Sequence, residues 1–181
     1  MIFLTEQEKE TFHEILLPYE NDEIVLKMKN YCQHGNVSTY EHVMNVALTC
    51  FYINRKKNFG CNEIDLVTAA FLHDFYLYDW HKKDNNTHRL HGFFHPMVAA
   101  INATKYFHVN KSVRNIILCH MWPLTFFHFP KSKEALLGEI CTKTFVLVDF
   151  CNFISVYSVF VADYKIFFYN GFRKKIFFGV D

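Results

Sequence analysis

Apolar residues recur at intervals of three and four along much of the chain, which is the spacing of residues on one face of an α-helix. The clearest run is Val43, Val46, Ala47, Cys50 and Phe51. Alternating apolar and polar segments joined by a tight turn do not stand out, so no β-hairpin is predicted. The pattern therefore predicts an all-α protein, a single-domain helical bundle of six to seven helices without internal repeats.

Side chains that can cap helices mark where these segments begin. Two pairs have the spacing of a capping box, Thr5 with Glu8 and Ser38 with Glu41. Three further candidates for capping residues precede apolar-periodic segments: Asn62, Asn110 and Ser132. His95-Pro96 fits a helix entry with proline at the first helical position. The last helical segment is predicted to run from residue 133 to about residue 158. Residues 79–94 are expected to form a polar loop, and a loop of this length is often functional.

Composition narrows the class of protein. The 181 residues are 51% hydrophobic and 20% charged, which suits one domain over residues 1–181 with its own core. A formal charge of +1 supplies no overall field that would attract nucleic acid or acidic lipid. The six cysteines form no C-x-x-C pair and are expected to be small core residues in a reducing cytoplasm. We therefore expect a cytoplasmic protein with no nucleic-acid and no membrane partner.

Both ends of the chain bear on this expectation. The N-terminus becomes acidic at Glu6 and shows no signal peptide. Residues 145–162 are strongly apolar but contain Asp149 and Asn152, so a buried helix is expected there and not a membrane span. In the C-terminal tail, residues 164–181, three basic residues at 173–175 stand between phenylalanine clusters. This tail is interpreted as a docking element, a contact of a homodimer or a strand, and the pattern does not choose among the three.

Histidine and aspartate residues occur at helical positions among apolar neighbours. The candidate metal ligands are His42, His73, Asp74, His95, His120 and Asp149. Successive gaps of 31, 21, 25 and 29 residues each correspond to about one helix and a turn, so consecutive helices would each present a ligand to the interior of the bundle. Six ligands exceed the needs of one tetrahedral zinc ion. They match two ions that share a bridging carboxylate, for which Asp74 is the natural choice because His73 lies beside it.

The order of these residues resembles a known family. The segments "STYEHVMNVA", "AAFLHDFYLYDW", "LHGFFHPMVAAINA" and "CHMWPL", with Asp149 after them, resemble the H…HD…H…H…D pattern of two-metal members of the HD-domain superfamily of metal-dependent phosphohydrolases. The resemblance covers roughly residues 34–155, and the four quoted segments together resemble a group of small stand-alone bacterial HD proteins. Two positions depart from it. Tyr78 and Asp79 stand where many HD enzymes carry Lys or Arg, and no Lys follows Asp149.

The resemblance implies hydrolysis of a phosphoester or phosphoanhydride, in a nucleotide or another small phosphorylated metabolite, by metal-activated water. The ligand set suits two divalent ions, with Fe expected ahead of Mn, Zn, Ni or Co. Asp74 is the expected catalytic residue, since it would bridge the ions or orient the nucleophile. Five residues are candidates for substrate binding: His34, His91, Arg89, Lys82 and Lys83. Either of the two histidines would be placed to protonate a leaving oxygen, although loop residues of these types are often merely exposed.

Three other interpretations stay open. The domain would act as a sensor if it bound metal and nucleotide without turnover. The same ligands would serve oxygen chemistry in an HD-type di-iron oxygenase. A purely structural bundle would bind no stoichiometric metal. Metal analysis followed by a substrate panel identifies the sensor, and spectroscopy with substrate tests identifies the oxygenase. The structural bundle predicts little change of melting temperature with chelator.

Overall fold

The computed structural model describes residues 2, 4–82 and 90–150, except for the side chains of His34 and of residues 145–150. The chain divides into two units, residues 1–145 and residues 146–181. The prediction of a single domain over residues 1–181 stays a prediction. The C-terminal tail, residues 164–181, and residues 151–158 of the last predicted helix lie outside the described residues.

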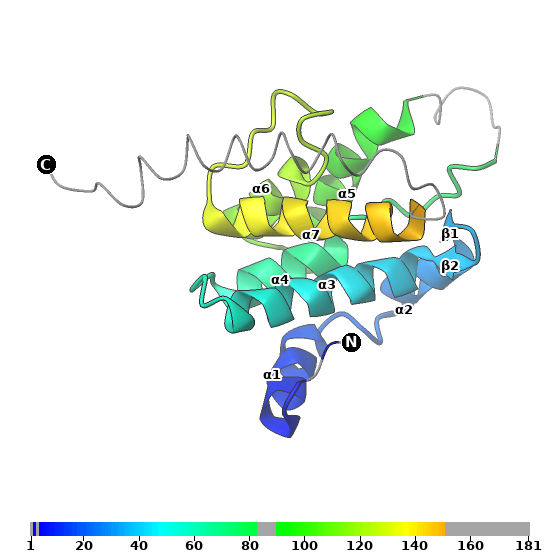
Figure 1. The fold of residues 1–181 in the computed structure, drawn as a ribbon. Coiled ribbons are helices and arrows are strands. Elements are labelled where there is room, and N and C mark those ends of the chain that lie inside the picture. Colours follow the sequence, from blue (N-terminus) through cyan, green and yellow to red (C-terminus); the bar gives the residue numbers. More distant parts are fainter. Residues whose placement is uncertain (1, 3, 83–89, 151–181) are drawn as a thin grey trace, which may run out of the picture. The chain divides into compact units, whose positions relative to one another are not determined.

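The described elements are almost entirely helical (Figure 1). In chain order they are α1 (Glu6–Leu16), α2 (Glu23–Leu26), the 3₁₀ turn η1 (Lys27–Asn30), β1 (Cys32–His34), β2 (Val37–Ser38), α3 (Thr39–Lys56), α4 (Glu63–Leu72), α5 (His91–Phe107), α6 (Lys111–Cys119) and α7 (Lys133–Phe150). The all-α prediction is confirmed.

The predicted capping residues begin their helices. The hydroxyls of Thr5 and Ser38 accept the backbone N–H groups of Glu8 and Glu41, whose carboxylates bond back to the capping residues. The side-chain oxygens of Asn62, Asn110 and Ser132 accept backbone N–H groups three residues later. These bonds satisfy N–H groups that have no partner within the first turn of a helix. The start signals in the sequence were therefore sufficient for five helices.

Helix α5 begins earlier than predicted. It starts at His91, so Pro96 lies inside the helix and the predicted loop over residues 79–94 is too long by four residues. No side chain caps this helix, because Leu90 stands at the capping position. The sequence thus carried no signal for a helix start at His91. Proline is most common at the first helical position, so Pro96 wrongly indicated a start at His95-Pro96.

A small hairpin was missed. Strands β1 and β2 pair antiparallel, with Cys32 opposite Ser38 and His34 opposite Val37. The turn between them consists of Gly35 and Asn36, and Gly35 has a φ of 56°, in the left-handed region that favours glycine. Strands of three and two residues are too short to show alternation, which explains why the sequence pattern did not reveal them.

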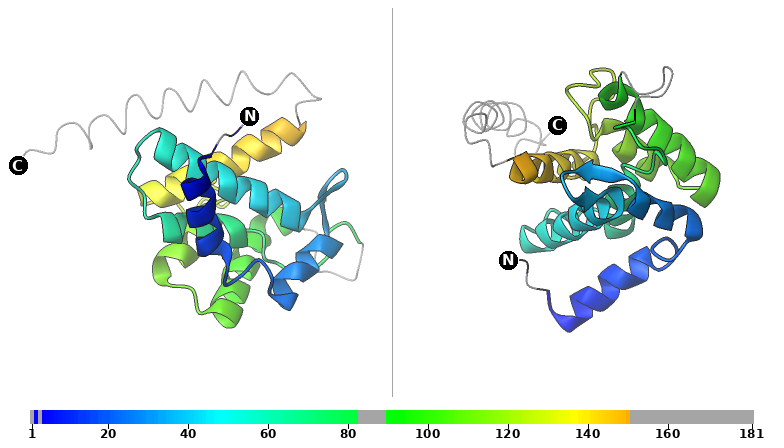
Figure 2. Two further views of the ribbon diagram at one scale, coloured as in Figure 1. Left: turned by 90° about the horizontal axis from the view of Figure 1, so that it is seen from below. Right: turned by 90° about the vertical axis from the view of Figure 1, so that its right-hand side faces the viewer.

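The core of the first unit lies between α4 and its neighbours. Helix α4 packs against α3, α6 and α1, and α5 packs against α6. Figure 1 and Figure 2 show α3 and α4 lying side by side. The periodic run of α3 from Val43 to Phe51 supplies five fully buried residues, and every residue of α4 from Leu66 to Leu72 is buried. None of the described helices combines the length and hydropathy needed to cross a lipid bilayer.

Candidate metal centre

Five of the six predicted ligands come together in the core. His42 lies in the first turn of α3, directly after the capping box of Ser38. His73 and Asp74 follow the last residue of α4, His120 follows the last residue of α6, and His95 lies in α5. Each of the five is 5% exposed or less. Ionisable groups are buried to this extent only when partners compensate the lost hydration.

Asp74 is the centre of the cluster. Its Oδ2 lies 3.3 Å from His73 Nε2 and 3.7 Å from His42 Nε2. Its Oδ1 lies 3.3 Å from His95 Nε2 and 3.5 Å from His120 Nε2. The ligand atoms therefore form two groups of three that share one carboxylate: His42 with His73, and His95 with His120.

Backbone carbonyls set the orientation of three of the imidazole rings. The Nδ1 atoms of His73, His95 and His120 lie 2.7, 2.8 and 2.7 Å from the carbonyl oxygens of Ala70, His91 and Ile117. A carbonyl oxygen can only accept, so each Nδ1 carries the proton and donates. Each Nε2 then faces Asp74 and is the ring nitrogen that can bind a metal when it carries no proton. This is the usual arrangement of a histidine that binds a metal through Nε2.

The donor atoms fit divalent cations. His95 Nε2 and His120 Nε2 lie 2.8 Å apart, and two lone pairs at that distance repel unless a proton or a cation lies between them. Two nitrogen ligands of one ion, with bonds of about 2.1 Å at a right angle, are separated by about 3 Å. Among the described residues, His73 Nε2 and Asp74 Oδ1 have no hydrogen-bond partner although both are buried. Four imidazoles and a carboxylate suit a first-row transition metal.

Electrostatics within the cluster favour a charged carboxylate. Burial alone would raise the pKa of Asp74, but the neighbouring His73 and His95 hold it well below its ordinary value. Burial would likewise lower the pKa of His73, yet the Asp74 carboxylate raises it overall. Burial, together with repulsion from His95 and His73, keeps the pKa of His120 well below its ordinary value. His120 is therefore neutral near pH 7, the state in which imidazole binds a metal.

The sequence interpretation missed a group of polar residues around Asp74. Gln33 on β1 donates from Nε2 to Asp74 Oδ2 over 2.7 Å, and Tyr76 donates from its hydroxyl to Gln33 Oε1 over 2.6 Å. Thr39 Oγ1 lies 3.3 Å from the same Oε1 and 3.2 Å from the Tyr76 hydroxyl. Gln33 belongs to the hairpin that the pattern did not predict, and no motif in the sequence marks it.

Aromatic rings extend from the cluster through the predicted substrate residue His91. The ring of His91 stacks on that of His95, with centroids 4.5 Å apart, and on that of Trp80, with centroids 5.0 Å apart. The Tyr78 hydroxyl lies 2.9 Å from His91 Nδ1. Burial, and then the charge of Asp74, raise the pKa of Tyr78 to about 12. The phenol therefore keeps its proton at neutral pH. The structure thus brings His91 next to the candidate ligands.

The structure does not place the other predicted site residues at the cluster. Lys82 is exposed and its Nζ lies 3.5 Å from an Asp79 carboxylate oxygen. Lys83 and Arg89 lie outside the described residues. The backbone of His34 lies in β1, but its side chain is not described. Asp149 falls within α7, and its side chain is also not described. Their predicted roles stay predictions.

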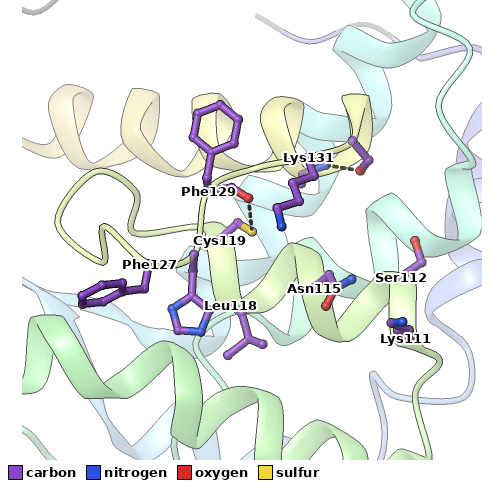
Figure 3. Close-up of a pocket in the computed structure, with 11 residues that line it drawn as sticks. Lys111, Ser112, Asn115, Leu118, Cys119, Phe127, Phe129 and Lys131 are labelled. Atoms are coloured by element: carbon purple, nitrogen blue, oxygen red, sulfur yellow. Dashed lines mark hydrogen bonds between the residues drawn. The ribbon is translucent and has the colours of Figure 1, made fainter.

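A surface hollow of about 460 Å³ lies against α6 and the start of α7 (Figure 3). Its lining includes Lys111, Phe127 and Lys131, and none of the five clustered residues. The Cys119 thiol points into this region and donates to the Phe129 carbonyl oxygen over 3.6 Å. Burial raises the pKa of Cys119 to about 11. The thiol beside His120 is therefore protonated near pH 7 and is directed at a backbone carbonyl instead of the cluster.

Comparison with known proteins agrees with this geometry. A family model described as HD domain matches residues 39–136, more than half of the chain, and the matched span holds all five clustered residues. Searches of curated proteins and of solved structures find no match. The resemblance to HD domains inferred from the sequence is confirmed. The chain therefore belongs to the HD domain family, whose members are largely metal-dependent phosphohydrolases.

Proposed function

We propose that the chain is a dinuclear metal-dependent phosphohydrolase that cleaves a phosphoester or phosphoanhydride bond of a nucleotide or another small phosphorylated metabolite. The observation that supports this most strongly is the pair of ligand groups that share Asp74. One buried carboxylate between two pairs of imidazoles is what two adjacent ions require. A single ion would leave two of the four histidines without a ligand role.

The proposed ligands divide between the two ions. His42 and His73 would hold one ion through Nε2, His95 and His120 would hold the other, and Asp74 would bridge them. Asp149 is proposed as the sixth ligand. When bound, divalent ions lower the pKa of a water nucleophile and offset the charge that builds on a phosphoryl group. Iron is the first expectation, and Mn, Zn, Ni and Co suit the same donors.

The protein's own contribution to the reaction is orientation and desolvation. Backbone carbonyls hold three imidazoles in the tautomer that presents Nε2. The buried residues of α4 before His73 keep water away from one side of the cluster, which strengthens electrostatic interactions there. If the Tyr78 phenol donates to His91 Nδ1, then Nε2 of His91 carries a proton. We propose that this N–H contacts a phosphoryl oxygen of the substrate.

The test is a substrate screen with defined metals. The protein is stripped with chelator, reloaded separately with Fe(II), Mn, Zn, Ni and Co, and assayed on a generic phosphomonoester, a generic phosphodiester and a panel of nucleotides. Asp74→Asn serves as the inactive variant. His13→Gln is the matched control, because His13 is an exposed histidine of α1. We expect hydrolysis by the wild type and the control and none by Asp74→Asn.

Two outcomes would contradict the proposal in different ways. Metal-replete protein that hydrolyses nothing across the panel would favour a regulatory domain that binds metal and nucleotide. Oxygen consumption that depends on substrate and on Fe(II) would favour an HD-type di-iron oxygenase. Either result would leave the metal centre in place but would rule out hydrolysis of a phosphoester or phosphoanhydride as its reaction.

A further inference from the structure

The hairpin β1–β2 carries one side chain into the metal centre. Gln33 is 7% exposed, and its Nε2 is 2.7 Å from Asp74 Oδ2, a contact that joins residues 41 positions apart in the chain. This Oδ2 is the oxygen that faces His42 and His73. The other oxygen, Oδ1, receives no hydrogen bond from the described residues. The carboxylate is therefore supported from one side only.

The direction of the Gln33 amide is determined by its neighbours. The buried Tyr76 hydroxyl donates to Oε1 over 2.6 Å. Thr39 Oγ1 lies 3.3 Å from the same oxygen. With Oε1 used as an acceptor, the NH₂ end must face Asp74, which can accept and cannot donate when it is ionised.

Three separate segments of the chain meet in this network. Gln33 comes from β1, Thr39 from the first residue of α3, and Tyr76 from the turn after α4. Thr39 and Tyr76 are 0% and 2% exposed. Buried polar groups whose hydrogen bonds are all made fix one arrangement, because any rotation would leave a buried donor or acceptor unpaired.

We propose that Gln33 is a positioning residue of the metal centre, which holds the bridging carboxylate of Asp74 in the rotamer that lets Oδ1 and Oδ2 face the two histidine pairs. Tyr76 and Thr39 act through Gln33 by fixing its amide. This inference rests on the proposed metal centre and extends it to residues that bind no ion. Hydrogen-bond partners of metal ligands typically contribute 10- to 100-fold to metal affinity.

The test uses Gln33→Leu, which keeps the approximate volume of the side chain and removes its hydrogen bonds. The dissociation constants of Mn and Zn are measured by competition with a chelating dye, and the melting temperature is measured without metal. The matched control is Asn54→Leu. Asn54 is also a buried amide, 4% exposed, which bonds to the backbone of Cys61 and not to the cluster. Tyr76→Phe removes only the hydroxyl that orients the amide.

We expect Gln33→Leu to weaken metal binding by 10- to 100-fold, Tyr76→Phe to weaken it by a smaller factor, and Asn54→Leu to lower the melting temperature without changing the dissociation constant. Unchanged metal affinity in both Gln33→Leu and Tyr76→Phe would overturn the positioning role while the metal centre stands. A wild type that binds neither metal would overturn the metal centre, and this inference with it. If Gln33→Leu does not fold, Tyr76→Phe alone decides the question.

Discussion

Replacing Asp74 by Asn would separate the metal role of this residue from its structural role. Asn has the shape of Asp but no charge. Its carbonyl oxygen can take the place of Oδ2 and accept the proton that Gln33 donates over 2.7 Å. Its NH₂ group can take the place of Oδ1, which lies 3.3 and 3.5 Å from the Nε2 lone pairs of His95 and His120. The metal-free variant is therefore expected to fold with the hydrogen bond from Gln33 retained.

The metal affinity of Asp74→Asn should fall steeply. All four imidazole Nε2 atoms lie within 3.7 Å of a carboxylate oxygen, so an ion among them would lie within about 4 Å of the negative charge. Two unit charges at 4 Å attract by about 4 kcal/mol at an effective dielectric of 20, and a divalent ion doubles this figure. Part of this attraction is offset, because an ion bound at Nε2 excludes the proton that the raised pKa of His73 favours. A net loss of at least about 3 kcal/mol weakens binding by at least about 100-fold.

Two assays measure these effects. Competition titration gives the dissociation constant, and thermal melting with and without chelator gives the stabilisation by metal. The expected result is a metal-free melting temperature no higher than that of the wild type, since the low pKa of Asp74 means that its charged form stabilises the fold near pH 7, together with no effect of chelator on the variant. Metal binding by Asp74→Asn at wild-type affinity would refute the assignment of Asp74 as the bridge.

Three more predictions concern other parts of the structure. Asp74 raises the pKa of His73 against the effect of burial, so the contribution of protonated His73 to stability is full below about pH 6.5, its unfolded pKa, and is lost as the pH rises through the folded pKa. The metal-free wild type should therefore melt at a lower temperature at pH 8.5 than at pH 7, and the decrease should be smaller in Asp74→Asn. Equal decreases in melting temperature in the two proteins would contradict this prediction. Asp149→Ala should reduce metal content and turnover, as elemental analysis and the phosphatase assay would show, and full retention of both would remove Asp149 from the ligand set. Ser38→Ala breaks the capping box before His42 and should reduce the free energy of unfolding by about 1 kcal/mol, which lowers the melting temperature by about 2–4 °C. An unchanged melting temperature would mean that the cap does not stabilise the fold.

The helices, and the positions of the five clustered residues within them, were predictable because both follow local patterns. The five apolar residues that repeat at helical spacing between Val43 and Phe51 are fully buried, and Ser38 with Glu41 forms the predicted capping box. His42 could be identified as a ligand candidate because it lies in the first turn of that helix among apolar neighbours. Such signals are contained within about ten residues of sequence.

Features that depend on distant contacts were not predictable. Gln33 matters because of a bond across 41 residues, and its strand is too short to leave a pattern. Helix α5 begins at His91 without a capping side chain, so Pro96 gave a false start. The contact between Tyr78 and His91 joins a turn to a helix 13 residues away. Only the packed structure brings such groups together, since neither sequence spacing nor residue type points to the pair.

The central claim is that Asp74 bridges two ions. Crystals of the metal-loaded wild type, with anomalous diffraction recorded at the absorption edge of the loaded metal, would test this directly. The account predicts two anomalous peaks on either side of the Asp74 carboxylate, one beside His42 and His73 and the other beside His95 and His120. Full metal loading with no peak at this carboxylate, or a single peak bound by only one histidine pair, would contradict it.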